Sequence, residues 1–431
     1  MEILALILFV SILLLILYGY PVSFTLGGVS LLYLLFFVEP VYYAALPQRI
    51  MGTMSNYVLL AVPLFIFMGI MLEKSGLAES MLDTMGLLFG KIRGGLAVSV
   101  ILVGALLAAS TGIVGATVIT MGLISLPTML RRGYAPTLAT GTIAASGTLG
   151  QIIPPSIVLV LLGSVLNVSV GQLFRAAFIP GILLVICYII YVLIVARVKP
   201  ELAPPISDAE LKDFWQSGVF KKIIIAFVMP LLLIVLVLGS IFFGIASPTE
   251  AAAVGAFGAT LLTISQGKLS WKICKDVMEE TTHLTCMVFM ILLGATTFSF
   301  AFRQLGGDHF LIETITQFDL SATTFLLVVM LIIFVAGFFI DFIEIIFIIV
   351  PVVAPIFIAY EIDLIWVGVL IAMNLQTSFL TPPFGFSLFY LKGVSPPEVT
   401  TTHLYKGIIP FVGIQLLFLF TVIFFPALIG L

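Results

Sequence analysis

Two short stretches of this chain combine oxygen-bearing side chains with a Pro-Pro pair inside an otherwise apolar run. Residues 145–158 read ASGTLGQIIPPSIV and residues 373–386 read MNLQTSFLTPPFGF. Because a proline inside a helix removes a backbone donor and clashes with the preceding turn, each pair predicts a broken helix. Within a bilayer, broken backbone is tolerated only where protein or a watery cavity satisfies its polar groups. These first and second Pro-Pro segments are therefore candidate binding sites for a cation or a polar substrate.

The candidate residues of the Pro-Pro segments are hydroxyl, amide and small residues together with the prolines. A simple proline kink is the alternative interpretation, but a kink does not require this density of oxygen atoms. Asn and Gln supply donors as well as acceptors, which suits a carboxylate or hydroxyl group. The candidates are Ser146, Thr148, Gly150, Pro154, Pro155 and Ser156 in the first segment, and Asn374, Gln376, Thr377, Thr381, Pro382 and Pro383 in the second.

A third polar cluster, ASTGIVGA at residues 109–116, interrupts the long apolar segment 94–128 and is named the first tip. Glycine permits close approach and unusual backbone dihedrals, and helix N-termini that meet at a tip favour an anion. Small-residue packing between membrane helices is the structural alternative. The candidates are Ser110, Thr111, Gly112 and Gly115, and hydroxyl and carbonyl oxygens suggest Na⁺ near Ser110, Gly150 and Thr377.

Asp341 and Glu344 form an ionisable pair within a second long apolar segment, 321–358. Carboxylates at membrane depth are costly unless they are paired or hydrated, which makes them functional candidates. Three residues apart, they share a helix face. They can bind a cation, carry a proton or cap the helix that follows, and capping is the purely structural alternative.

The composition predicts a polytopic membrane protein embedded in a lipid bilayer. The chain of 431 residues is 61% hydrophobic and 9% charged, and long apolar runs recur along it. No basic run indicates nucleic-acid binding, and the three histidines have no metal-ligand spacing. The sequence contains no catalytic motif that indicates an enzyme. A channel is a further alternative, but the two re-entrant hairpins described below favour a transporter that exposes its site to each side of the membrane in turn.

The distribution of Lys and Arg sets the expected topology, because cytoplasmic loops carry the excess of these residues. Basic residues flank 94–128 on both sides, which predicts a re-entrant hairpin open to the cytoplasm. The flanks of 321–358 are acidic, at Asp319 for example, which predicts a hairpin open to the outside. Lys212, Lys221 and Lys222 belong to an expected cytoplasmic loop, and the N-terminus is expected outside.

About ten further spans are expected, and landmarks recur among them at an offset of about 228 residues. Pro127 matches Pro355, and the first Pro-Pro pair matches the second. We therefore expect an all-α fold of two inverted repeats, 1–200 and 201–431. The expected parts are scaffold spans within 1–73 and 222–266, hairpins at 94–128 and 321–358, and broken spans at 136–165 and 363–391.

Four stretches give the chain a resemblance to a known family. They read GATVITMGLISLPTMLRRGY, GTLGQIIPPS, FIDFIEIIFIIVPVVAPIF and NLQTSFLTPPFGF. In this order the chain resembles, over essentially its full length, the large membrane subunit of tripartite ATP-independent periplasmic (TRAP) transporters. The run Asp-Phe-Ile-Glu at 341–344 departs from members of the sialic-acid type and is closer to a subgroup linked to 2-oxo acids, lactate and similar carboxylates.

The resemblance implies an elevator-type secondary transporter in the bacterial inner membrane. It implies import of a small organic acid coupled to Na⁺, with no other cofactor. It also implies two partners, a periplasmic substrate-binding protein and a small membrane subunit of about four helices. A stand-alone carboxylate/Na⁺ symporter that needs no binding protein is the alternative.

Overall fold

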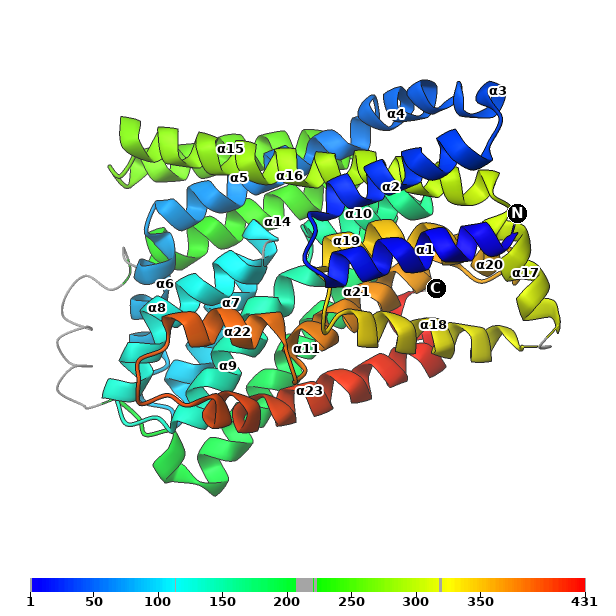
Figure 1. The fold of residues 1–431 in the computed structure, drawn as a ribbon. Helices are drawn as coiled ribbons and strands as arrows, with labels where there is room; N and C mark the ends of the chain where they lie inside the picture. The colour runs from blue at the N-terminus through cyan, green and yellow to red at the C-terminus, as the bar shows by residue number, and fades with distance from the viewer. Residues whose placement is uncertain (1, 113, 207–219, 221–222, 318–319, 431) are drawn as a thin grey trace.

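The computed structural model describes residues 2–112, 114–206, 220, 223–317 and 320–430, and every regular element among them is a helix (Figure 1). Lys212, Lys221, Lys222 and Asp319, which entered the expected topology, lie outside the described residues.

The helices of the first half begin with two apolar helices and end with one of 29 residues. Their bounds are α1 Glu2–Leu17, α2 Val22–Phe37, α3 Pro40–Tyr43, α4 Leu46–Met54, α5 Ala61–Lys74, α6 Leu77–Leu88, α7 Gly95–Thr111, α8 Val114–Arg131, α9 Pro136–Thr148, α10 Ile157–Leu166 and α11 Val170–Val198.

The second half contains the longest described helix, α16, of 34 residues. The bounds are α14 Met229–Phe242, α15 Pro248–Ser265, α16 Trp271–Gln304, α17 Gly307–Gln317, α18 Ala322–Ala336, α19 Phe342–Ile348, α20 Val350–Ala359, α21 Leu364–Leu380, α22 Phe386–Val394 and α23 Thr401–Phe424.

Six helical stretches are individually long and apolar enough to cross a membrane. They are Tyr57–Lys74 (which includes α5), α8, α11, Ile224–Phe242 (which includes α14), α16 and α23. The pair α19 and α20, bent by 50°, makes a possible seventh. The expected count of about ten is larger because six apolar helices, α1 and α2 among them, have only 10–17 residues. At 1.5 Å per residue, such helices are short for the hydrocarbon core, about 30 Å thick.

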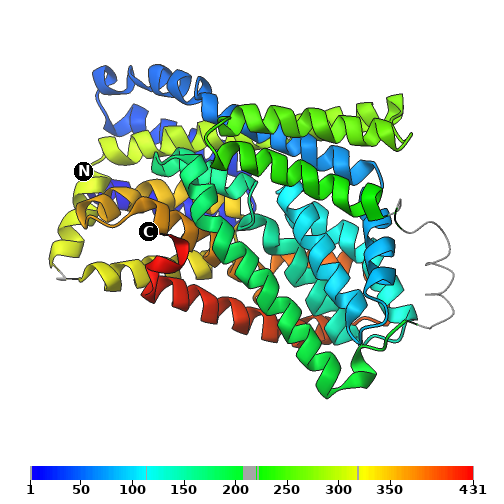
Figure 2. The ribbon, with the colours of Figure 1, turned by 180° about the vertical axis from the view of Figure 1, so that it is seen from behind.

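The helices form two packed groups (Figures 1 and 2). In one group α2 packs against α16, and α15 packs against α5 and α14. In the other, α9 packs against α7, α8 and α23, and α21 packs against α10, α11 and α18. Figure 2 shows α11 crossing the back of the molecule, where Tyr188 meets Phe411 of α23 edge-on at 5.0 Å between ring centroids.

In each of the two long apolar segments, the start and the end of the segment lie close together. The first segment contains α7 and α8, and the second contains α18, α19 and α20. The N–H of Gly94, before α7, donates to the carbonyl of Ala203, and the N–H of Ala135, after α8, donates to the neighbouring carbonyl of Leu202. In the second half, the hydroxyl of Tyr360 after α20 donates to the carbonyl of Leu320 before α18, at 2.6 Å. Both segments therefore turn back on themselves.

The helical backbone is interrupted at both Pro-Pro pairs. In the first Pro-Pro segment, α9 ends at Thr148, a 3₁₀ turn covers Leu149–Gln151, and α10 begins at Ile157. In the second, α21 ends at Leu380 and α22 begins at Phe386. Both Pro-Pro peptide bonds are cis.

Candidate functional site

The first tip lies between α7 and α8, and its described residues are buried except for the half-buried Gly115 and Ala116. Gly112 ends α7 with φ +61°, a left-handed conformation that favours glycine. The Thr111 hydroxyl lies 2.7 Å from that of Thr117, and the Ser110 hydroxyl donates to the carbonyl of Leu107 at 2.8 Å. Both candidate hydroxyls therefore have protein partners, and the tip would offer a ligand their remaining lone pairs.

The first tip rests directly on the first Pro-Pro segment. A Cβ on Gly150 would lie 2.2 Å from the carbonyl oxygen of Ala108, and a Cβ on Gly112 would lie 2.9 Å from the side chain of Ile157. No side chain fits at Gly150, so the two backbones touch there. The structure thus brings together two sets of candidates about 40 residues apart in the sequence.

The first Pro-Pro segment is wholly buried, and its hydroxyls bond to nearby carbonyl groups. Ser146 donates to Ile143, Thr148 to Ala145 and Ser156 to Gln151, at 2.9–3.0 Å. The amide of Gln151 differs, because neither of its polar atoms has a hydrogen-bond partner among the described residues, although the residue is fully buried. Gln151 lies in the polar stretch directly before the prolines, where the sequence indicates a site for a cation or a substrate.

The second Pro-Pro segment contains a matching amide. Gln376 is fully buried, and both its polar atoms lack a partner within the described part of the chain. Asn374 instead donates to the carbonyl of Met330 in α18 at 2.6 Å, which joins α21 to α18. The hydroxyls of Thr377 and Thr381 donate to the carbonyls four residues earlier. Gln376 is therefore free for a ligand, whereas Asn374 has a structural bond.

The second Pro-Pro segment is the more open of the two. Thr381 and Pro382 are half-buried, and Pro383 is exposed and accepts a hydrogen bond from Tyr405 at 2.7 Å. The ring of Phe384 contacts that of Phe339 at a tilt of 58°, with 5.3 Å between ring centroids, and both residues are exposed. An aromatic pair thus covers the second Pro-Pro segment, whereas the first Pro-Pro segment is enclosed by helices.

Residues 337–341 connect α18 to α19 and are named the second tip; Asp341 is the last of them, and Glu344 follows within α19. A carboxylate oxygen of Asp341 accepts the N–H of Phe342 at 2.7 Å, and Asp341 is the N-cap of α19. Glu344 is half-buried in the first turn of the same helix. A Cβ on Gly337 would lie 2.1 Å from the Ser378 hydroxyl, so the second tip meets the second Pro-Pro segment. Asp341 makes the capping contact that the sequence left as an alternative.

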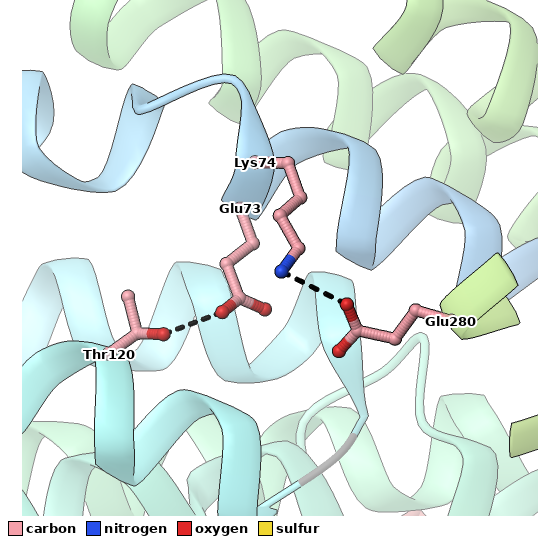
Figure 3. Close-up of polar contacts among 4 residues, drawn as sticks. All are labelled: Glu73, Lys74, Thr120 and Glu280. Carbon is pink, nitrogen blue, oxygen red and sulfur yellow. Dashed lines mark hydrogen bonds and ion pairs between the residues drawn. The ribbon is translucent and has the colours of Figure 1, made fainter. Parts of the chain in front are cut away.

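A carboxylate that the sequence analysis did not select joins α5 to α8 (Figure 3). Glu73, near the end of α5, accepts a hydrogen bond from Thr120 of α8 at 2.6 Å, and its other oxygen is buried without a partner among the described residues. The adjacent Lys74 forms an ion pair with Glu280 of α16 at 3.0 Å. The sequence signal for Glu73 was its position, a carboxylate at the end of an apolar run.

The other end of this helical stretch also contacts the second group of helices. Asn56, which precedes Tyr57–Lys74, donates from its amide to the Ser164 hydroxyl of α10 at 3.2 Å. The stretch is therefore hydrogen-bonded at both ends to helices that carry the tips and the Pro-Pro segments.

Comparison with known sequences identifies the family. The family described as "Tripartite ATP-independent periplasmic transporter, DctM component" matches residues 9–428. The chain belongs to this family. The resemblance found in the sequence motifs is thereby confirmed, and the protein is a TRAP transporter large permease.

Two relatives in the TRAP family illustrate the sequence similarity to this permease. The C4-dicarboxylate TRAP transporter large permease protein DctM of Pseudomonas aeruginosa is 34% identical over 89% of this chain and 88% of its own. The sialic acid TRAP transporter large permease protein SiaM of Vibrio cholerae is 30% identical over 95% of this chain and 93% of its own. Relatives of similar identity are thus named for different acids.

A solved structure shares the fold of this TRAP permease. The YdaH transporter of Alcanivorax borkumensis superposes with a TM-score of 0.62 over 88% of this chain and 87% of its own, at 14% sequence identity. At that identity the similarity concerns the arrangement of helices alone.

Proposed function

We propose that this TRAP permease imports a small organic acid together with Na⁺, at a site formed by the two tips and the two Pro-Pro segments. The observation that carries the proposal is the close contact between a tip and a Pro-Pro segment, which occurs once in each half of the chain. In the first half Gly150 touches Ala108, and in the second Ser378 touches Gly337. Residues 150 and 378 differ by 228, and residues 108 and 337 differ by 229, so the two contacts are made at nearly equivalent positions of the two halves.

The packing of whole helices supports two repeats. At the same offset α2 corresponds to α15 and α5 to the second half of α16, and the contact of α2 with α16 is matched by that of α15 with α5. The contact of α9 with α23 is likewise matched by that of α21 with α11. Such reciprocal contacts are expected of two copies related by a pseudo-two-fold axis, as in many transporters.

The coupling ion we propose is Na⁺, bound near Ser110, Gly150 and Thr377. These residues lie at or near helix ends, where backbone carbonyls have no N–H partner within the helix and hydroxyl groups are close by. Oxygen ligands of this kind suit a hard cation. Among the described residues no group of three His, Cys, Asp or Glu side chains is arranged to hold a metal.

The substrate class we propose is a carboxylate. C4-dicarboxylates and sialic acid, for which two relatives are named, both carry this group. The amides of Gln151 and Gln376 supply N–H donors, and neither makes a protein hydrogen bond in the described part of the chain. A buried amide without a partner is costly, so a ligand that accepts its hydrogen bonds stabilises the site.

The mechanism we propose is an elevator. Helices α7–α11 and α18–α23, which carry both tips and both Pro-Pro segments, would move as one block past a frame formed by α1, α2, α4, α5, α14, α15 and α16. The re-entrant hairpins would then be α7–α8 and α18–α20, whose ends meet in pairs. The contacts of Asn56 with Ser164 and of Glu73 with Thr120 would join frame and block in this conformation.

Reconstituted uptake tests the proposal. The permease, a small membrane subunit and a periplasmic binding protein, the partners we propose for it in the bacterial inner membrane, are assayed in proteoliposomes with labelled lactate, 2-oxo acids, succinate and sialic acid. We expect uptake that requires an inward Na⁺ gradient and stops when choline replaces Na⁺. Uptake driven by a proton gradient alone would refute Na⁺ coupling, and full uptake without the binding protein would favour the stand-alone symporter.

A further inference from the structure

A cavity of about 530 Å³ lies apart from the tips and the Pro-Pro segments. Its walls come from α4 and α16 on one side and from α10, α19 and α20 on the other. Figure 1 shows α4 and α20 toward the end of the molecule that carries α3 and α17, and α16 running along the molecule toward that end. The volume is within the range of small-molecule sites.

The charges that line this cavity have one sign. Arg49 of α4 and Arg303 in the last turn of α16 are both lining residues, and no Asp or Glu is among the described residues that line it. The Arg303 guanidinium lies 3.5 Å from the Asp308 carboxylate, which offsets part of its charge. Arg49 makes no ion pair within the described part of the chain. A guanidinium presents paired donors that match a carboxylate.

Neutral hydrogen-bonding groups complete the polar side of the cavity. The amides of Asn56, Asn167 and Gln304 line it, and the Asn56 amide bonds to the Ser164 hydroxyl across the boundary between the two groups of helices. Phe300 and Phe347 contribute apolar surface. Polar donors beside an apolar wall are the composition of a site for a small organic anion.

We propose that this cavity is a second carboxylate site, which holds the acid at the outer end of the permease before the acid reaches the tips and the Pro-Pro segments. Both arginines lie on the proposed frame, whereas α10, α19 and α20 belong to the proposed block. Movement of the block therefore changes the shape of the cavity, because it displaces one wall while both arginines remain in place on the other. A cavity lined by one sign of charge raises the local concentration of the opposite ion. The position of this site on the transport route rests on the proposed function.

Charged thiol reagents measure the field in the cavity without any transport. Ser299, a half-buried lining residue, is replaced by Cys in a background in which Cys187, Cys274 and Cys286 are replaced by Ala. The purified permease is labelled with sulfonatoethyl or trimethylammonioethyl methanethiosulfonate at low salt. The ratio of the two rates cancels any change in the thiolate fraction. We expect the anionic reagent to react faster.

Replacing both arginines identifies the source of the field. We expect R49Q together with R303Q to lower the ratio of anionic to cationic rates by about tenfold, the low end of the effect of a charged cleft. The matched control R197Q removes an exposed arginine at the end of α11, outside the cavity, and should leave the ratio unchanged. Acetate, lactate or succinate should slow labelling in the parent protein but not in the double variant.

Two labelling outcomes would overturn the carboxylate site, and both are separate from failure of Na⁺-coupled uptake. Equal rate ratios in the parent and the double variant would show that the arginines do not attract anions into the cavity. Labelling that none of the three acids slows would show that no carboxylate binds there. In proteoliposomes we expect the double variant to lose uptake at limiting substrate and to recover it at saturating substrate; unchanged uptake at limiting substrate would remove the cavity from the route.

Discussion

At the scale of single residues, two kinds of polar side chain share the Pro-Pro segments. Asn374 is bonded to Met330 of a neighbouring helix, whereas the polar atoms of Gln151 and Gln376 have no partner among the described residues. The first kind stabilises the fold. The second kind is costly to bury and is therefore the better candidate for ligand contact.

Replacing Gln376 by Leu should separate these roles. The change removes an amide without a protein hydrogen bond, so the unfolding temperature of the purified permease should be unchanged or higher. Loss of one ligand hydrogen bond of about 1–1.5 kcal/mol should weaken substrate binding about tenfold. Asn374→Leu is the control and should lower the unfolding temperature, because it breaks the bond to Met330. Normal uptake by Gln376→Leu would exclude a role for this amide.

Asp341 has a capping role that can be tested apart from its charge. Asn caps a helix about as well as Asp, so Asp341→Asn should unfold at the wild-type temperature, whereas Asp341→Ala should lose about 0.5–2 kcal/mol of stability. We expect Asp341→Asn and Glu344→Gln to reduce uptake, because charges within apolar segments persist mainly where they function. If both variants transport at the wild-type rate with unchanged Na⁺ dependence, the pair is structural.

At the scale of helices, the site depends on backbone contact between the first tip and the first Pro-Pro segment. Gly150→Ala would place a Cβ 2.2 Å from the Ala108 carbonyl, and we expect a loss of about 1–3 kcal/mol in the free energy of unfolding. Gly239→Ala in α14, where no atom lies within 4 Å, is the matched control and should be neutral or stabilising. Equal thermal stability of the two variants would contradict the close contact.

The α7–α8 pair provides a test of topology. Because Gly94 and Ala135, at its two ends, bond to the adjacent carbonyls of Ala203 and Leu202, both ends should face one side of the membrane. We expect Ile92→Cys and Arg131→Cys, both at exposed positions, to react with a membrane-impermeant maleimide from the cytoplasmic side only. Labelling of the two positions from opposite sides would refute the re-entrant hairpin.

At the scale of the whole molecule, movement of the block past the frame should be arrested by a bond between them. The Asn56 amide and the Ser164 hydroxyl are 3.2 Å apart, so cysteines at these positions should form a disulfide that stops uptake until it is reduced. The control pair Thr53 and Thr296, with hydroxyls 3.3 Å apart, joins α4 to α16 within the proposed frame. Its disulfide should leave uptake intact. Full uptake through a verified disulfide between positions 56 and 164 would argue against an elevator.

The sequence by itself determined the features that depend on local chemistry. Apolar runs specify membrane helices, and each Pro-Pro pair interrupts a helix because proline removes a donor and clashes with the preceding turn. The motifs within residues 115–156 and 339–386 were sufficient to indicate the TRAP family, which the match over residues 9–428 confirms. These features need no knowledge of distant neighbours.

Only the tertiary structure decided which atoms meet. Gln376 and Asn374 are two residues apart and equally polar, yet one has no described partner and the other bonds to Met330, because successive helix positions face different neighbours. Arg49 and Arg303 line one cavity although half the chain separates them. Nor does the sequence show that Glu73 bonds to Thr120, since that contact depends on how two helices pack. Contacts between distant segments are set by packing, which no local pattern contains.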